Sequence, residues 1–187
     1  PHCNSKNARR RMTKVRIAIN GFGRIGRNIV RAIYESGGKD IDVVAVNDLG
    51  PVETNAHLLR YDSVHGRFPH DVAVKGDSIS IGTDTFKVTA IKDPSQLPWK
   101  DLGVDIALEC TGIFTSKEKC LAHLENGARR VLISAPGEGA DKTIVYGVNQ
   151  QQLSGDERLV SNASCTTNCG VPLLKVLNET IGIDYVS

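Results

Sequence analysis

The chain has 187 residues, of which 40% are hydrophobic and 24% are charged. These proportions are those of an ordinary globular protein and exclude a disordered or collagen-like polymer. Outside residues 1–11, which contain four of the 23 Lys and Arg residues, 19 basic residues face 21 acidic ones. No nucleic-acid partner is therefore expected, because nucleic-acid binding usually requires a concentrated basic face.

The chain shows no sign of membrane insertion or of a metal site. No apolar stretch reaches the ~18 residues of a membrane-spanning helix, and the segment before Met12 lacks the apolar part of a signal peptide. The five cysteines are an odd number without metal-like pairing. We therefore expect a cytoplasmic protein with reduced thiols, no membrane partner and no metal. Residues 1–11 are expected to be a disordered tail or upstream sequence.

Short β-branched runs alternate with segments of helical period from residue 12 onward. This pattern predicts an α/β fold of the Rossmann type, with a doubly wound, mostly parallel sheet. Turn signals between residues 70 and 91 predict an inserted, peripheral antiparallel hairpin formed by residues 79–81 and 86–88. The parallel strands are predicted over residues 15–19, 42–46, 104–108, 131–134, 144–148 and 159–161. Helices are predicted from residue 25 to the stop at residues 37–38, and over residues 55–61, 116–125 (after a Thr115–Glu118 capping box) and 171–181.

A glycine-rich string, Gly21-Phe22-Gly23-Arg24-Ile25-Gly26, follows the first predicted strand and opens the first predicted helix. In this context a G-x-G-x-x-G string is typical of dinucleotide binding. Gly21 would make the tight turn, Gly23 would let the backbone approach a pyrophosphate, and Gly26 would pack the helix against the strand. The free N–H groups of the helix N-terminus would bind the phosphates.

Asp48 stands 22 residues after Gly26, at the end of the second predicted strand. A carboxylate there accepts hydrogen bonds from the adenosine ribose and repels a 2′-phosphate, so NAD is preferred over NADP. The alternative is that Asp48 only caps the next helix. Thr111 and Gly112 follow another strand and offer either further cofactor contacts or an ordinary turn.

Cys165 lies among small and hydroxylic residues at the predicted start of a helix. Helix N-termini favour the thiolate, which is the nucleophilic form of cysteine. A thiolate beside a nicotinamide suits aldehyde oxidation through a thiohemiacetal and a thioester. The alternative is a buried, inert thiol, which we favour for Cys169, one helical turn later. Surface or capping roles are expected for His57, His65, His70 and His123.

Four segments, residues 20–27, 61–66, 134–136 and 164–169, together resemble phosphorylating glyceraldehyde-3-phosphate dehydrogenases. The resemblance implies NAD as cofactor, Cys165 as the nucleophile, and Ser164 and Thr166 as phosphate-binding residues. It also implies glyceraldehyde 3-phosphate and inorganic phosphate as substrates, and a homotetramer that acts in glycolysis. Lys92 stands where many members have an arginine near the adenine. With the glycine string included, the predicted cofactor-binding residues are Gly21, Phe22, Gly23, Arg24, Ile25, Gly26, Asp48, Leu49, Lys92, Thr111, Gly112 and Ser134.

The resemblance also implies a division into domains. Residues 12–163 would form the NAD-binding domain, and residues 164–187 would begin an α+β catalytic domain, of which only the first helix is included. The family's general-base histidine and substrate-phosphate arginine would follow Ser187. We therefore expect a truncated chain that is inactive alone.

Three other functions stay open. Erythrose-4-phosphate dehydrogenase shares the nucleotide fold and the cysteine motif, although Ala135 and residues 47–49 favour the glyceraldehyde enzyme. A dehydrogenase of the aspartate-semialdehyde type fits the glycine loop and the cysteine string less well. From a different class, the chain could be a non-catalytic NAD-binding fragment.

Overall fold

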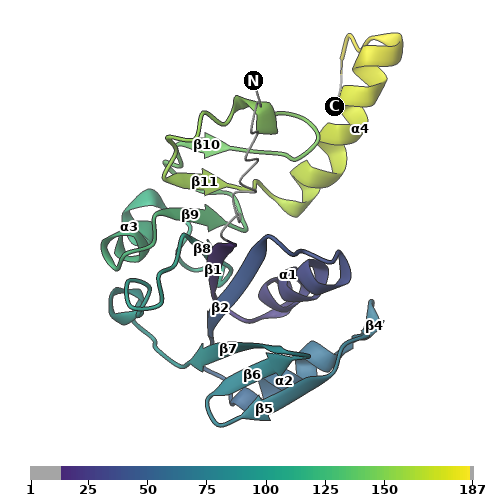
Figure 1. Ribbon diagram of the computed structural model, residues 1–187. Helices are drawn as coiled ribbons and strands as arrows, with labels where there is room; N and C mark the ends of the chain where they lie inside the picture. Colours follow the sequence, from purple (N-terminus) through teal and green to yellow (C-terminus); the bar gives the residue numbers. More distant parts are fainter. Residues whose placement is uncertain (1–13, 186–187) are drawn as a thin grey trace, which may run out of the picture.

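The computed structural model describes residues 14–185, so the predictions for residues 1–11 lie outside the described part. Within this range, nine strands form one sheet in the order β10-β11-β9-β8-β1-β2-β7-β6-β5 (Figure 1). Neighbours are parallel from β10 to β7 and antiparallel from β7 to β5. The predicted α/β fold with a mostly parallel sheet is confirmed.

The strands of the large sheet are β1 (Val15–Asn20), β2 (Ile41–Asn47), β5 (Val72–Lys75), β6 (Ser78–Ile81), β7 (Asp84–Thr89), β8 (Ile106–Glu109), β9 (Arg130–Ile133), β10 (Lys142–Thr143) and β11 (Leu159–Ser161). A separate antiparallel pair consists of β3 (Tyr61–Asp62) and β4 (Gly66–Arg67). The helices are α1 (Arg24–Glu35), α2 (Val52–Arg60), α3 (Lys117–Glu125) and α4 (Cys165–Ile181), with short 3₁₀ turns η1 (Pro94–Gln96) and η2 (Gln150–Gln152).

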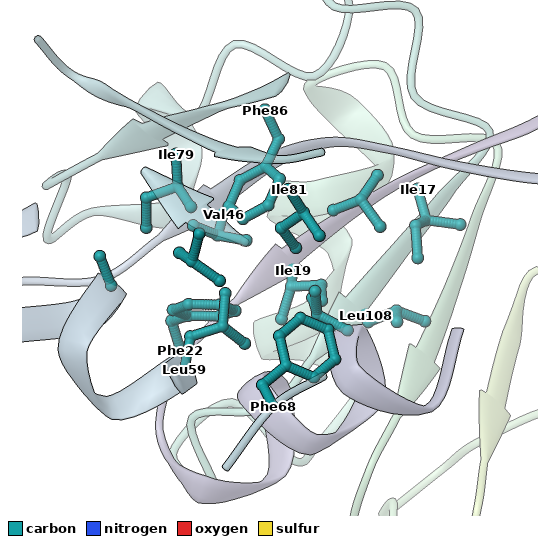
Figure 2. Close-up of a cluster of buried hydrophobic side chains, with 14 residues drawn as sticks. Ile17, Ile19, Phe22, Val46, Leu59, Phe68, Ile79, Ile81, Phe86 and Leu108 are labelled. Atoms are coloured by element: carbon teal, nitrogen blue, oxygen red, sulfur yellow. The ribbon is translucent and has the colours of Figure 1, made fainter. Parts of the chain in front are cut away.

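The sheet is covered on both faces, and β1 shows how the sequence directs this. Ile17 and Ile19 belong to a core cluster on the side of α1 and α2, whereas Ala18 belongs to a second cluster on the side of α3. Successive side chains of a strand point to opposite faces, so apolar residues at consecutive positions indicate a strand buried on both sides. Figure 2 shows the first cluster, in which Phe22 and Leu59 meet the strand residues.

The predicted hairpin is present but is less peripheral than expected. Strands β6 and β7 pair around the turn at Gly82, and β5 adds a third antiparallel strand. Because β7 also pairs with β2, the hairpin extends the main sheet at one edge. Ile79 and Phe86 are buried in the first core cluster (Figure 2), so this insertion is part of the folding core.

The predicted strand over residues 144–148 is wrong. The strand is β10, which ends at Thr143, and the chain then enters a turn with Tyr146 exposed. The amide of Asn149 explains the change, because it accepts a hydrogen bond from Val145 N and donates one to the Thr143 carbonyl. A local side-chain hydrogen bond of this kind competes with strand pairing.

Two predicted helix boundaries also shift. Helix α2 begins at Val52 rather than at residue 55. Helix α3 begins after Ser116, whose hydroxyl accepts the Lys119 N–H and so occupies the N-cap position predicted for Thr115. The predicted helices after the glycine string and after Cys165 are confirmed.

Helix α4 extends away from the sheet, as Figure 1 shows in yellow. None of its residues is buried within the described chain, and its exposed apolar side chains include Leu173, Val176, Leu177 and Ile181. Between residues 14 and 185, no helix has the length and apolarity needed to span a bilayer.

Candidate functional site

The glycine loop lies between β1 and α1 with the close approaches that its sequence predicts. Gly21 has φ = 92°, and a Cβ there would meet the Thr111 nitrogen at 2.7 Å. A Cβ on Gly26 would meet the Gly21 oxygen at 2.3 Å and Ile19 Cγ2 of β1 at 3.1 Å, so Gly26 lets the helix pack closely against the strand and the loop, as predicted for the strand. By contrast, apart from Gly23 and its two chain neighbours, no described residue has a heavy atom within 4 Å of a Cβ built on Gly23. The loop is therefore tight where it packs and open at the position where a phosphate would approach.

The N-terminus of α1 faces this opening. No side-chain hydrogen bond from the described residues caps the helix, and its first turn contains no acidic residue. The first backbone N–H groups of a helix lack intrahelical partners and carry the positive end of the helix dipole. This end of α1 can therefore bind an anionic group such as a pyrophosphate.

Asp48 follows β2 and contacts the loop directly. Its Oδ2 accepts a hydrogen bond from Phe22 N at 3.0 Å, and its Oδ1 accepts one from Gly50 N at 2.9 Å. The alternative helix-cap role is not observed, since α2 begins after Pro51 without a side-chain cap from the described residues. Asp48 instead joins the end of β2 to the glycine loop.

A cavity of about 490 Å³ opens at the carboxyl ends of β1, β2 and β8. This volume lies within the usual range for small-molecule sites. Six of the predicted cofactor-binding residues line it, namely Gly21, Gly23, Asp48, Leu49, Lys92 and Thr111. The lining also includes Asn20, Asn47, Ile91, Cys110, Ile113 and Phe114, which were not among the predicted site residues. Asn20 and Asn47 carry a sequence signal, because each is a polar residue at the end of a buried strand.

The other predicted cofactor residues lie outside the lining. The Phe22 side chain is fully buried in the core, and its N–H is bound to Asp48. Ile25 is exposed, Gly112 follows Thr111 with φ = 73°, and Ser134 N donates to the Glu109 carbonyl.

Arg24 is exposed and forms an ion pair with Asp62 at 3.0 Å. The N–H groups of His65 and Val64, followed by Arg24, hold the pKa of the Asp62 carboxyl far below its ordinary value. Arg24 therefore joins the start of α1 to the β3–β4 turn.

Cys165 is exposed and is the first residue of α4. Ser164 is the N-cap, and its hydroxyl accepts the Thr167 N–H at 3.0 Å and lies 2.9 Å from the Thr166 hydroxyl. Ser164 and Thr167 also line a second cavity of about 450 Å³, together with Thr115, Pro136, Gly137, Glu138, Thr143 and Ala163. The predicted helix-start position of Cys165 is confirmed.

Ser161 holds the turn that leads to Cys165. Its fully buried hydroxyl donates to the Ala135 carbonyl at 2.8 Å and accepts the N–H groups of Gly137 and Ala163 at 3.0 and 3.1 Å. Ala163 has φ = 57°, which is rare for a residue with a Cβ. The β11–α4 turn is thus fixed in an uncommon conformation and joined to the loop that follows β9.

The remaining thiols and histidines separate into exposed and buried groups. Cys169 is exposed and free, so the expected buried thiol is wrong. Burial raises the pKa of Cys110 to about 11 and that of Cys120 to about 12. The surface or capping role expected for His123 is also wrong, because this side chain is fully buried. Within residues 14–185, no three His, Cys, Asp or Glu side chains are grouped to hold a metal ion.

The parallel sheet, the glycine loop and the cavity at the strand ends define a Rossmann-type dinucleotide-binding domain. A family model described as glyceraldehyde 3-phosphate dehydrogenase, NAD binding domain, matches residues 15–117. The chain belongs to the glyceraldehyde 3-phosphate dehydrogenase family and contains its NAD-binding domain.

Curated relatives extend the similarity beyond this domain. Glyceraldehyde-3-phosphate dehydrogenase of Xanthobacter flavus is 66% identical over 170 residues, which cover 91% of this chain and 51% of the relative. The protein of the same name from Cereibacter sphaeroides is 66% identical over 169 residues, with 90% and 50% covered. That of Pseudomonas aeruginosa is 55% identical over 172 residues, with 91% and 52% covered. The chain therefore spans about half the length of the curated relatives it matches.

Proposed function

We propose that the protein catalyses the NAD-dependent oxidative phosphorylation of glyceraldehyde 3-phosphate to 1,3-bisphosphoglycerate, as a step of glycolysis. One observation carries this proposal. Strands β1 and β11 run in the same direction in one sheet, so the glycine loop after β1 and the turn to Cys165 after β11 lie at the same edge. A cofactor site and an exposed thiol are thereby brought to one side of the molecule. The names of the relatives supply the substrate.

The residues around the first cavity fit NAD. The pyrophosphate would lie over Gly23 against the N-terminus of α1, because the space there is open and the N–H groups are free to donate. Asp48 would bind the adenosine ribose, and Lys92 would lie near the adenine. Thr111 would contact the NAD from the opposite wall of the cavity. When bound, NAD supplies the acceptor for the hydride that leaves the substrate.

Cys165 would form the covalent bond to the substrate. Its thiolate attacks the aldehyde carbon, so that a C–S bond forms and the carbonyl oxygen gains a proton, giving a thiohemiacetal. The carbon then gives its hydride to the acceptor that bound NAD would supply, the hydroxyl gives its proton to a base, and the C=O bond re-forms, which leaves a thioester on Cys165. An oxygen of inorganic phosphate then attacks the thioester carbonyl, and the C–S bond breaks to return the thiolate.

The hydroxyl groups at the start of α4 would hold the phosphate. Ser164 and Thr166 lie within hydrogen-bonding distance of each other and next to Cys165. Hydroxyl groups at the N-terminus of a helix are suited to a phosphate because both the side chains and the backbone N–H groups donate. We assign Ser164 and Thr166 to this role.

We also propose that residues 12–163 form the NAD-binding domain and that α4 begins a catalytic domain. The apolar side chains that α4 exposes support this division, since an exposed apolar face of this kind commonly packs against further structure. The cytoplasmic location and the homotetramer stay predictions.

Cys165→Ser in the natural polypeptide tests the proposal. We expect turnover to be abolished and the dissociation constant for NAD to be unchanged, because a neutral alcohol is a far weaker nucleophile than a thiolate. Cys169→Ser is the matched control and should keep its turnover. Retained turnover in Cys165→Ser would place the nucleophile elsewhere.

Erythrose-4-phosphate dehydrogenase is the alternative within the same chemistry. Hydroxylamine traps the thioester as a hydroxamate, so its yield with each aldehyde phosphate separates the two substrates. A higher yield with erythrose 4-phosphate would contradict our choice. A natural polypeptide that binds NAD but forms neither hydroxamate would be a non-catalytic NAD-binding protein.

A further inference from the structure

Polar side chains form a row across the sheet at the carboxyl ends of four neighbouring strands. Asn20 in β1 is the register partner of Glu109 in β8 and of Asn47 in β2. Asn47 is in turn the register partner of Thr89 in β7. Asn20, Asn47 and Glu109 are all buried. The four residues stand at one level of the sheet, and we call them the polar row.

Each hydrogen bond along the polar row is donated toward Glu109. Thr89 Oγ1 donates to Asn47 Oδ1 at 2.8 Å, and Asn47 Nδ2 donates to Asn20 Oδ1 at 2.8 Å. Asn20 Nδ2 then donates to Glu109 Oε2 at 2.7 Å. The orientation of the Asn47 amide is supported by its reciprocal bonds with Ile91 N and the Ile91 carbonyl. Aligned bonds of this kind polarise one another, and here they converge on one carboxylate.

A second buried chain of hydrogen bonds, from Trp99 through His123, ends on the same oxygen of Glu109. Trp99 Nε1 donates to His123 Nδ1 at 3.0 Å, and an indole nitrogen can only donate, so Nδ1 carries no proton. His123 Nε2 therefore holds the ring proton and donates it to Glu109 Oε2 at 2.9 Å. The imidazole is neutral in this arrangement, so it stabilises the carboxylate as a hydrogen-bond donor and not as a counter-ion. Trp99 and His123 are fully buried.

The other oxygen of Glu109 holds one wall of the first cavity. Thr111 donates its N–H to Glu109 Oε1 at 2.8 Å and donates its hydroxyl to the same oxygen. Thr111 Oγ1 in turn accepts the Ile113 N–H at 3.1 Å. Thr111, Ile113, Asn20 and Asn47 line the cavity, whereas Glu109 is buried behind them.

We propose that Glu109, oriented by His123 and Trp99, is a positioning residue for cofactor binding: it fixes the floor of the cavity through Asn20 and Asn47 and the wall through Thr111. This inference rests on the proposed binding of NAD in that cavity. Both oxygens of Glu109 face only donors. A carboxamide of the same shape would therefore point its own N–H groups at donors, and at least one of the hydrogen bonds that Glu109 accepts would be lost.

The variant Glu109→Gln in the natural polypeptide tests the proposal, with NAD affinity measured by titration calorimetry. We expect the dissociation constant to rise about tenfold, which corresponds to the loss of one hydrogen bond to a charged group. The KM for NAD should rise more than kcat falls. Val131→Ala is the matched control, since Val131 is buried in the second core cluster outside the polar row. It should lower the melting temperature and leave NAD affinity within about twofold.

A second variant keeps the test decisive if Glu109→Gln does not fold. Trp99→Phe combined with His123→Phe removes both members of the buried Trp–His hydrogen bond and retains aromatic side chains, so folding should be tolerated. The dissociation constant should rise about threefold, because Glu109 keeps its other donors. Unchanged NAD affinity in folded Glu109→Gln, or in the folded double variant when the single variant does not fold, would overturn the positioning role. Failure of the unaltered protein to bind NAD would instead overturn the proposed function, and this inference with it.

Discussion

At the scale of single residues, the carboxylate of Asp48 both contacts the glycine loop and lines the first cavity. It orders the glycine loop through Phe22 N, and it leaves part of its side chain in the cavity where the adenosine ribose would bind. We expect discrimination against NADP to arise from that second contact, because a 2′-phosphate would meet a negative charge. The hydrogen bond from Phe22 N to Asp48 would not distinguish NAD from NADP.

We therefore expect Asp48→Ala to lower the preference for NAD over NADP by about tenfold or more, since a hydrogen bond to a charged group contributes about 1.5–3 kcal/mol. The ratio of kcat/KM for the two cofactors measures this preference. Asp93→Ala, at the start of η1 and outside the cavity lining, is the control. An unchanged ratio in Asp48→Ala would mean that the residue only orders the loop.

Cys120 gives the fold a dependence on alkaline pH. Its thiol is buried and lies 3.2 Å from the Phe114 carbonyl, and burial raises the pKa of this thiol to about 12 from an ordinary value of 9.0. Between these pH values the unfolded chain loses a proton that the folded chain keeps. The contribution of the protonated Cys120 thiol to the free energy of unfolding is therefore fully present below pH 9 and is lost as the pH rises toward 12.

In Cys120→Ala, we expect the free energy of unfolding to fall less steeply with pH above pH 9 than in the unaltered protein. Urea unfolding at a series of pH values from 7 to 11 gives the slope. Cys169→Ala, which removes an exposed thiol, should retain the steeper slope. Identical slopes in the unaltered protein and Cys120→Ala would show that this thiol does not titrate differently on unfolding.

The sequence predicts those residues whose signal is local. Gly21 and Gly26 are recognisable because a tight turn and a close packing each exclude a side chain, and Gly23 because it leaves open space where a phosphate would approach. Glu109 and His123 are not recognisable in this way. Their buried contact joins a strand to a helix 14 residues later, and only the folded sheet brings them together. For this reason the sequence predicted a surface or capping role for His123, whereas its side chain is buried.

The turn between β11 and α4 is the element on which the proposed chemistry would depend. Ser161 joins this turn to the loop after β9 through three hydrogen bonds, and Asn168 Nδ2 donates to the Asn162 and Ser164 carbonyls from within α4. These contacts hold Ala163 at its positive φ. The direction in which Cys165 leaves the sheet follows from them.

Ser161→Ala should lower kcat by about tenfold to a hundredfold, because a shift of about 1 Å in a reacting group has an effect of that size. The KM for NAD should change little, since Ser161 is outside the first cavity. Steady-state kinetics of the natural polypeptide measure both values. Ser36→Ala, which removes only an exposed bond to the Ile33 carbonyl, is the control. A kcat equal to that of the unaltered protein would contradict a positioning role for Ser161.

Helix α1 is joined to the β3–β4 pair by a buried arginine. Arg31 donates to the carbonyls of Leu59 and Gly66 and lies 5.1 Å from the centre of the Phe68 ring. We expect Arg31→Met to lower the free energy of unfolding by about 2–4 kcal/mol, because the buried carbonyl groups lose their donors. Urea unfolding measures the change. Arg129→Met, at an exposed ion pair, should cost less than about 1 kcal/mol. Equal effects of the two substitutions would contradict the structural role of Arg31.

Strands and helices were predictable where the hydrophobic period is long and regular. Strand β1 and helix α1 follow from such patterns, and the β6–β7 hairpin follows from its turn residues. The predicted strand over residues 144–148 failed because Asn149 closes a turn there, and the buried Val145 bonds to the Asn149 side chain and not to a neighbouring strand. Apolar content alone does not distinguish a strand from a buried turn.

At the scale of the whole molecule, the parallel sheet determines where the chemistry can occur. The carboxyl ends of strands β1, β2, β8 and β11 all lie at one edge of the sheet. Gly21 and Cys165 therefore lie on the same side of the molecule despite their distance in the sequence. The fold class and this edge were predictable from the alternation of strands and helices. The polar row beneath the cavity was not, because it depends on strand register.

The most direct test of the proposed chemistry is mass spectrometry of the natural polypeptide after mixing with NAD and glyceraldehyde 3-phosphate without inorganic phosphate. The thioester should accumulate, and peptide mapping should place one acyl group on Cys165, to be released when phosphate is added. The exposed Cys169 provides an internal control and should stay unmodified. An acyl group on another residue, or none in a protein that binds NAD, would contradict the assignment of Cys165 as the nucleophile.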